Sequence, residues 1–207
     1  MMRCNTPRLG VPALVLCLAM AGCTTDRTTE PPESATEQFL VSSAVDDAVS
    51  KLKIALPAGT ALFVDAQYLD TAPADHQRYP KYLIGTVRDH LARQGFRLAE
   101  ERKTADVVVE LRSGAQSIDH DGYLIGLPGF SAPVPLAGTM TLPEVALYKR
   151  DQRFGIAKVA LTFLNRADGS LAAPSALAFG RADRTGWTAL LFYSWEKDDL
   201  PPETRPR

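Results

Sequence analysis

The chain has 207 residues, of which 45% are hydrophobic, so it is long enough to bury one core and short enough to form a single domain. Its 23 Lys and Arg residues nearly balance its 24 Asp and Glu residues, which gives a formal net charge of −1. The sequence has no Lys- or Arg-rich run and no basic stripe interleaved with aromatic residues, which excludes the usual signature of nucleic-acid binding.

The first 22 residues have the three parts of a signal peptide. Arg3 and Arg8 are positively charged, residues 9–18 are mostly apolar, and Ala21 and Gly22 are small. The apolar part is too short for a permanent membrane-spanning helix, which needs about 20 residues, so the pattern predicts a cleaved secretory signal.

Small residues directly before Cys23 resemble the bacterial lipobox, with Ala21 and Gly22 in front of the cysteine. The resemblance implies that Cys23 becomes the first mature residue and carries a diacylglyceryl thioether and a further acyl chain, which together hold a protein stably at a membrane. Thr24 follows in place of Asp, which favours the outer membrane, facing the periplasm, in a Gram-negative organism. The alternative is an ordinary secretory signal followed by a chance cysteine.

The other two cysteines, Cys4 and Cys17, lie in the segment that we expect to be removed. The mature chain would then have no free thiol, and so no disulfide, no cysteine-ligated metal and no cysteine nucleophile. No cofactor is expected.

The predicted elements follow a polar linker over residues 23–35. A helix is expected over 36–52, where Ser34 and Glu37 have capping-box spacing and apolar residues recur on one face. A buried strand follows over 61–66, and a second helix runs from Pro80 to Gly95. Strands are then expected over 96–99 and over 105–111, the latter extending as far as Ile118.

Residues 119–143 are apolar but contain many Gly and Pro residues, which predicts a long irregular loop. A strand over 155–165 is followed by an Asp168-Gly169 hairpin turn and a return strand over 171–182, with Pro174 at a sheet edge. Periodicity does not decide whether residues 187–195 form a buried strand or a short apolar helix. We place them in the core.

These elements predict an α/β (α+β) sandwich: a mixed sheet of about five strands with two main helices packed on one face. The domain is expected over residues 36–196, followed by a disordered tail over 197–207.

Four sequence segments resemble the periplasmic lipoprotein α/β domain shared by CsgG, PelC and LpoB. They are residues 91–96, 105–109, 157–163 and 168–171. A closer resemblance is to an uncharacterised family of bacterial lipoproteins with a domain of unknown function. Its phrases are residues 105–110, Gly126-Leu127-Pro128, Pro143-Glu144 and 155–158. These resemblances imply a fold and an envelope setting, but no catalytic residues.

Asp119, His120 and Asp121 form the densest group of metal-ligand residue types and are weak candidates for a metal site, because neighbouring residues on a chain seldom converge on one ion. Asp65 is a second candidate, since it ends a predicted strand. We expect no metal and no catalytic set. The alternative is an envelope hydrolase or metal-dependent enzyme that uses these residues.

The apolar side chains of residues 119–143 suggest an interaction surface, since exposed apolar patches mark partners or membranes. Two alternatives are that the segment folds back over the sheet, or that it covers a site for a small ligand or lipid. The function expected is a lipid-anchored, non-catalytic interaction or assembly module of the cell envelope, with a protein partner or a homo-oligomer. The candidate surface residues are Tyr123, Leu124, Ile125, Leu127, Phe130, Val134 and Leu136.

Overall fold

The computed structural model describes residues 34–69, 78–134 and 138–200. The predicted signal peptide, Cys23, most of the linker and residues 201–207 lie outside the described residues. The described chain contains two α-helices, a short 3-10 helix and eight strands: α2 (Ala35–Ser50), β1 (Ala61–Asp65), α3 (Arg78–Arg93), β2 (Arg97–Leu98), η2 (Arg102–Thr104), β3 (Val107–Leu127), β4 (Phe130–Val134), β5 (Gly138–Leu142), β6 (Val145–Asn165), β7 (Leu171–Ala189) and β8 (Tyr193–Asp198).

Six strands form one curled mixed sheet in the order β2-β1-β3-β6-β7-β8. The first three are parallel, while β3, β6, β7 and β8 pair antiparallel. Strands β4 and β5 pair only with each other in a separate two-stranded sheet. The prediction of a mixed sheet with two helices is confirmed, but the prediction of about five strands is wrong.

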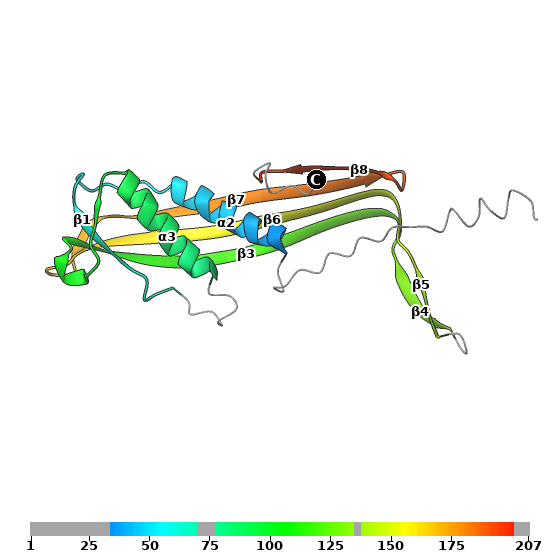
Figure 1. Cartoon of the computed structure of the whole chain (residues 1–207), viewed down its shortest axis with the longest axis horizontal. Coiled ribbons are helices and arrows are strands. Elements are labelled where there is room, and N and C mark those ends of the chain that lie inside the picture. The colour runs from blue at the N-terminus through cyan, green and yellow to red at the C-terminus, as the bar shows by residue number, and fades with distance from the viewer. Residues whose placement is uncertain (1–33, 70–77, 135–137, 201–207) are drawn as a thin grey trace, which may run out of the picture. The chain divides into compact units, whose positions relative to one another are not determined.

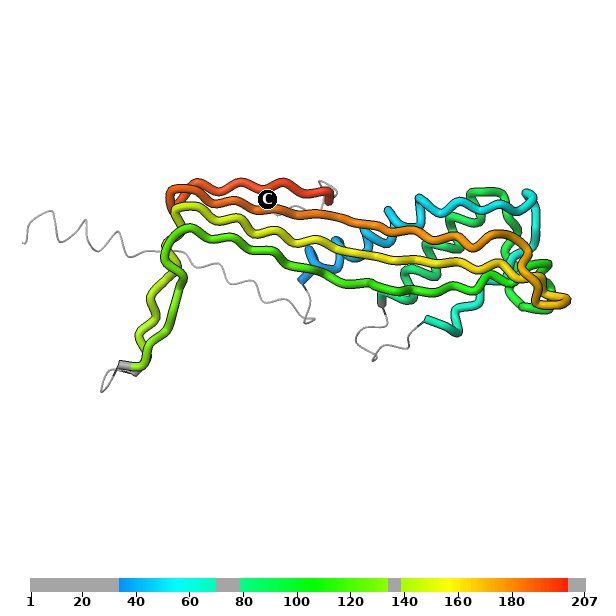
Figure 2. The backbone as a smooth tube through the Cα atoms, turned by 180° about the vertical axis from the view of Figure 1, so that it is seen from behind, coloured from blue at the N-terminus to red at the C-terminus, as the bar shows by residue number. Residues whose placement is uncertain are grey.

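Both helices lie on the same face of the large sheet, over one end of its long strands (Figure 1). Helix α2 begins with the predicted capping box, because the Ser34 hydroxyl accepts from the Glu37 N–H and the Glu37 carboxylate accepts from the Ser34 N–H. Helix α3 ends as expected before Gly95, whose φ of 86° suits a residue without a side chain. Figure 2 shows the opposite face, where no helix lies over the described strands.

The core lies between the helices and the covered end of the sheet. Apolar side chains of α2 and α3, among them Leu40, Val45, Leu83 and Leu91, pack with inward-facing residues of β1, β3, β6 and β7. Phe163 is the largest fully buried side chain.

Helix α2 lies unusually close to β6 and β7, and two glycines make this possible. A Cβ placed on Gly180 would lie 1.8 Å from the Ala44 carbonyl oxygen, and one on Gly155 would lie 2.3 Å from the Leu40 carbonyl oxygen. Both clashes are with helix backbone, which cannot rotate away as a flexible side chain can. The two glycines therefore set the distance between the helix and the sheet.

Residues 119–143 are not the irregular loop that the Gly and Pro residues predicted. Strand β3 continues to Leu127, and most of the remaining described residues belong to β4 and β5. Gly126 lies at a register shift between β3 and β6, with a φ of 153°, and a Cβ there would meet the Val145 carbonyl oxygen at 2.1 Å. The glycine thus permits a bulge in the strand instead of ending it.

Residues 187–195 form strand and not helix, which is one of the two alternatives, but a turn over residues 190–192 divides them and they do not belong to the core. They contain the end of β7, a tight turn and the start of β8, and Trp195 is exposed. Strand β8 includes Lys197 and Asp198, and Leu200 is buried, although the sequence placed residues 197–207 in the tail.

The edge of β7 that carries Pro174 is unpaired in the described chain, as predicted, because β8 pairs only with Arg184–Ala189. Side chains of α2 cover part of this edge. The Arg181 N–H donates to Asp47 Oδ2 at 3.0 Å, and Lys51 donates to the Phe179 carbonyl and to Asp47. The predicted 168–169 turn forms, but only Gly169 has a positive φ there.

Gly180→Ala should lower the free energy of unfolding by about 1–3 kcal/mol or more, because the new methyl group must displace the backbone of α2. Gly85→Ala is the matched control: Gly85 lies in α3 with no atom within 4 Å of a Cβ, so this change should stabilise the chain by about 0.5–1 kcal/mol. Urea unfolding of the two variants measures both effects. Equal effects would contradict the close seating of α2.

Asp47 should make folding sensitive to acid. Burial raises the pKa of its carboxyl, but hydrogen bonds from Lys51 and from the Arg181 N–H, with the charge of Lys51, outweigh burial and hold the pKa below its ordinary value of 3.8. The stabilisation is therefore present above that value and lost as pH falls through the lowered pKa. Asp47→Asn should lose less stability than wild type between pH 6 and pH 3 in urea unfolding. An equal loss of stability in the two chains would contradict this role of Asp47.

Candidate interaction surface

The helices cover only part of the long strands. Helix α2 begins beside Arg153 and Arg184, since Arg153 pairs with Glu37 and Arg184 donates to the Thr36 hydroxyl. Beyond this point β3, β6 and β7 continue with β8 and without any helix over them (Figures 1 and 2). We call this part the distal sheet. It comprises residues 119–127 of β3, 145–154 of β6 and 183–189 of β7, together with β8.

One row of side chains crosses the distal sheet from edge to edge. Tyr123 is paired with Arg150, Arg150 with Trp187, and Trp187 with Trp195. Residues paired in this way point to the same face, and alternation along β7 places this row on the face opposite the helices, with Phe179. The rings of Trp187 and Trp195 stack at 5.8 Å with an angle of 11° between their planes.

On the same helix-free face, the next row toward the end of the strands is also rich in large side chains. It contains Ile125, Tyr148, Ala189 and Tyr193. Tyr148 contacts Tyr123 edge to face with ring centroids 6.3 Å apart, and Tyr193 contacts Trp195 at 5.4 Å. The two rows together form an aromatic surface on the helix-free face.

At the end of the distal sheet, exposed apolar side chains gather on three turns and strand ends. The β7–β8 turn contributes Leu190, Leu191 and Phe192, and Phe192 is 83% exposed. Leu190 and Leu191 have positive φ values of 52° and 70°. Residues other than Gly and Asn are strained in this left-handed backbone conformation. Leu127 and Leu147 are also exposed, as are Phe130, Met140 and Leu142 of the separate β4–β5 sheet.

The surface predicted from the sequence overlaps with this region. Tyr123, Ile125, Leu127 and Phe130 are exposed, and Leu124 is half-buried on the helix side of β3. Val134 ends β4, but its side chain, like the whole of Leu136, lies outside the described residues.

The structure separates the three weak metal candidates. His120 points to the helix side of the sheet, where its Nε2 lies 2.9 Å from Asp151 Oδ2, whereas Asp119 and Asp121 alternate to the other face. Within the described residues no three His, Cys, Asp or Glu side chains are grouped as metal ligands. The other candidate, Asp65, ends β1 and is bound by Arg102 at 3.3 Å and by the Gln67 N–H.

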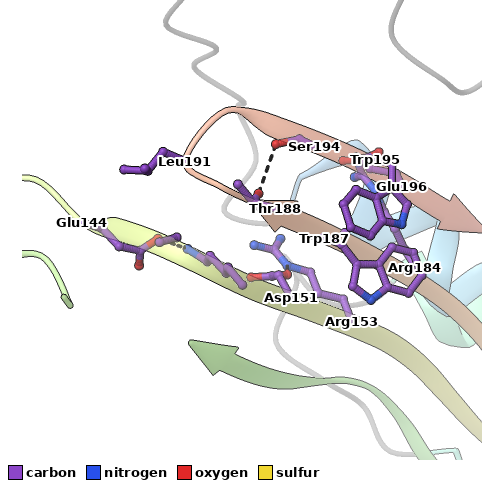
Figure 3. Close-up of a pocket in the computed structure, with 13 residues that line it drawn as sticks. Glu144, Asp151, Arg153, Arg184, Trp187, Thr188, Leu191, Ser194, Trp195 and Glu196 are labelled. Carbon is purple, nitrogen blue, oxygen red and sulfur yellow. Dashed lines mark hydrogen bonds and ion pairs between the residues drawn. The ribbon is translucent and has the colours of Figure 1, made fainter. Parts of the chain in front are cut away.

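A hollow of ≈ 510 Å³ is lined by residues of β6, β7 and β8, together with Glu144 and Leu191 (Figure 3). Its volume falls within the range of small-molecule sites, about 300–1,000 Å³, but such sites are mostly apolar. This hollow is lined by charged groups that pair with each other: Lys149 with Glu144, Arg153 with Asp151, and Arg184 with Glu196. We therefore find no unpaired polar group here that calls for a ligand.

Sequence reasoning missed the contribution of β8 and of the β7–β8 turn. Trp187 and Ala189 alternate with polar or small residues as a strand requires, but residues 190–192 contain no Gly, Asn or Pro to signal a turn. The sequence signal that could have revealed the surface is the alternation of side chains along the two segments on either side of residues 190–192.

No described helix has both the length and the apolar character needed to cross a membrane. No curated protein matches the chain. Among solved structures, a putative neuraminyllactose-binding hemagglutinin homolog from Helicobacter pylori is similar over 72% of this chain and 71% of its own, with 9% sequence identity and a TM-score of 0.30, too low to establish a shared fold.

The sequence profile of the DUF6655 family, a family of unknown function, matches residues 17–176, which is more than half of the chain. This range includes the phrases between residues 105 and 158 that resemble an uncharacterised family. The chain therefore belongs to the DUF6655 family.

Proposed function

We propose that this chain is a non-catalytic interaction module of the bacterial envelope, anchored to the outer membrane by lipid on Cys23, and that the distal sheet is the surface through which it makes contacts. The single observation that carries the proposal is the concentration of exposed apolar and aromatic side chains on the distal sheet and on the β7–β8 turn at its end. Soluble monomers seldom expose contiguous apolar surface of this kind unless it meets a partner or a membrane.

The strained β7–β8 turn supports the same conclusion. Leu190 and Leu191 adopt left-handed backbone conformations that Gly or Asn would adopt with less strain, and both side chains remain exposed. Leucine at these two positions improves neither the stability of the fold nor the solubility of the chain. Strain held at an exposed site is typical of positions kept for binding.

The proposed anchor fits the start of the domain. Helix α2 begins at Ala35, twelve residues after Cys23, and the intervening sequence is polar with two prolines. A chain of this length spans at most about 40 Å when extended. A lipid on Cys23 would therefore keep the domain near the membrane while allowing the distal sheet to reach other envelope components.

Cys23→Ser should abolish acylation and move the chain from the membrane fraction to the soluble periplasmic fraction, because lipid is the proposed anchor. Incorporation of labelled palmitate and fractionation of cells measure both effects. Cys17→Ser, within the same predicted signal segment, is the control and should change neither. A labelled Cys23→Ser chain, or an unlabelled wild-type chain, would contradict the anchor.

The contact surface can be mapped by placing a photo-crosslinking amino acid in the full chain in intact cells. At Phe192, in the β7–β8 turn, the crosslinker should give defined protein adducts. At Leu171, an exposed residue at the opposite end of β7, it should give none. Leu191→Gly should then reduce the Phe192 adducts and also stabilise the fold by about 1 kcal/mol, because glycine relieves the strain. Equal adducts at Phe192 and Leu171, or none at either, would count against the distal sheet.

A further inference from the structure

The distal sheet has two edges without a partner strand in the described chain. Strand β1 pairs with β3 only as far as Glu110, so the outer edge of residues 111–127 is unpaired. Strand β8 is the last strand of the sheet, and no described strand lies outside it. An unpaired edge presents N–H and C=O groups that can bind another strand, and natural proteins usually block such edges or use them.

The two edges run in opposite directions and have complementary side chains. Strand β3 runs toward the end of the distal sheet and β8 runs back from it, because each neighbouring pair between them is antiparallel. The row that starts with Asp121 on β3 passes through Gln152 and Thr185 and ends with Lys197 on β8. Opposite charges therefore occupy the two ends of one row.

Asp121 and Lys197 are both exposed, and neither side chain has a hydrogen bond or an ion pair with another residue of the described chain. The row beside them has Tyr123 at the β3 edge and Trp195 at the β8 edge, and the row beyond has Ile125 and Tyr193. Three successive rows on one face thus end in pairs that favour cross-strand contact: one ion pair, one aromatic pair, and one aromatic–aliphatic pair.

We propose that the partner of the distal sheet is a second copy of this chain, whose β8 edge pairs antiparallel with the β3 edge in the register that continues the rows. This inference rests on the proposed function and names its partner. In that register Lys197 of one copy faces Asp121 of the next, and Trp195 faces Tyr123. The contact joins two different edges, so it is head-to-tail and leaves each end open to a further copy.

Engineered cysteines test this geometry directly. Within one copy Asp121 and Lys197 lie three strand spacings apart, about 14 Å, which is beyond the roughly 7 Å limit for a disulfide. The full chain carrying Asp121→Cys and Lys197→Cys, purified in mild detergent and oxidised, should form a ladder of dimers, trimers and larger species on a non-reducing gel. Mixed single variants should form dimers only, since each offers one edge.

The matched control carries Asp89→Cys, on the exposed side of α3, with Lys197→Cys. It should give at most a trace of dimer. A ladder as strong in the control as in the edge pair would overturn the proposed contact.

Charge reversal tests the same pairing without cysteine. Asp121→Lys or Lys197→Asp alone should weaken self-association of the full chain roughly tenfold in sedimentation velocity, because like charges then face each other across the edge. The double variant restores opposite charges between copies and should recover most of the association. Association that both single variants leave unchanged, or that the double variant does not recover, contradicts the register.

The outcomes separate this inference from the proposed function. A wild-type chain that remains monomeric at high micromolar concentration overturns the pairing of copies. If a photo-crosslinker at Phe192 then gives adducts with other proteins only, the distal sheet remains a contact surface with a different partner. If it gives none, both proposals fail.

Discussion

The length of the strands relative to the helices decides how this molecule is built. A helix of 16 residues is about 24 Å long, whereas a strand of 21 residues extends for about 70 Å. Helix α2 can therefore cover only about a third of β3 and β6. The residues beyond it must be stabilised by strand pairing and by side chains on the sheet itself, since no described helix reaches them.

The covered end shows how a short helix secures a wide sheet. Gly155 and Gly180 let the backbone of α2 lie directly on β6 and β7, and Asp47 and Lys51 bind the free edge of β7. The helix thereby buries the core and closes part of an edge at once. In the distal sheet, charged groups pair on the helix side, and aromatic rings contact one another on the other face. Neither arrangement removes the apolar surface at the end of the strands from solvent.

Much of the covered end could be predicted from the sequence, because its signals are local. The capping box at Ser34, the apolar stripe of α2, Gly95 after α3 and the β-branched run of β3 each predict a structure without knowledge of distant residues. The distal sheet could not be predicted in this way. Gly122 and Gly126 resemble strand breakers until β6 pairs with β3, and the turn at Leu190 and Leu191 has no turn residues. The candidate surface was recognised from its apolar residues, but its partner rows on β7 and β8 depend on a register that only the fold supplies.

If the distal sheet is the working surface, contacts in the cell must protect it. Amide hydrogen exchange of the full chain in native membranes, compared with the same chain purified and diluted, measures this protection directly. Residues 119–127 and β8 should exchange more slowly in membranes, with little change in α2 and β1. Equal exchange of the distal strands in both preparations would contradict it.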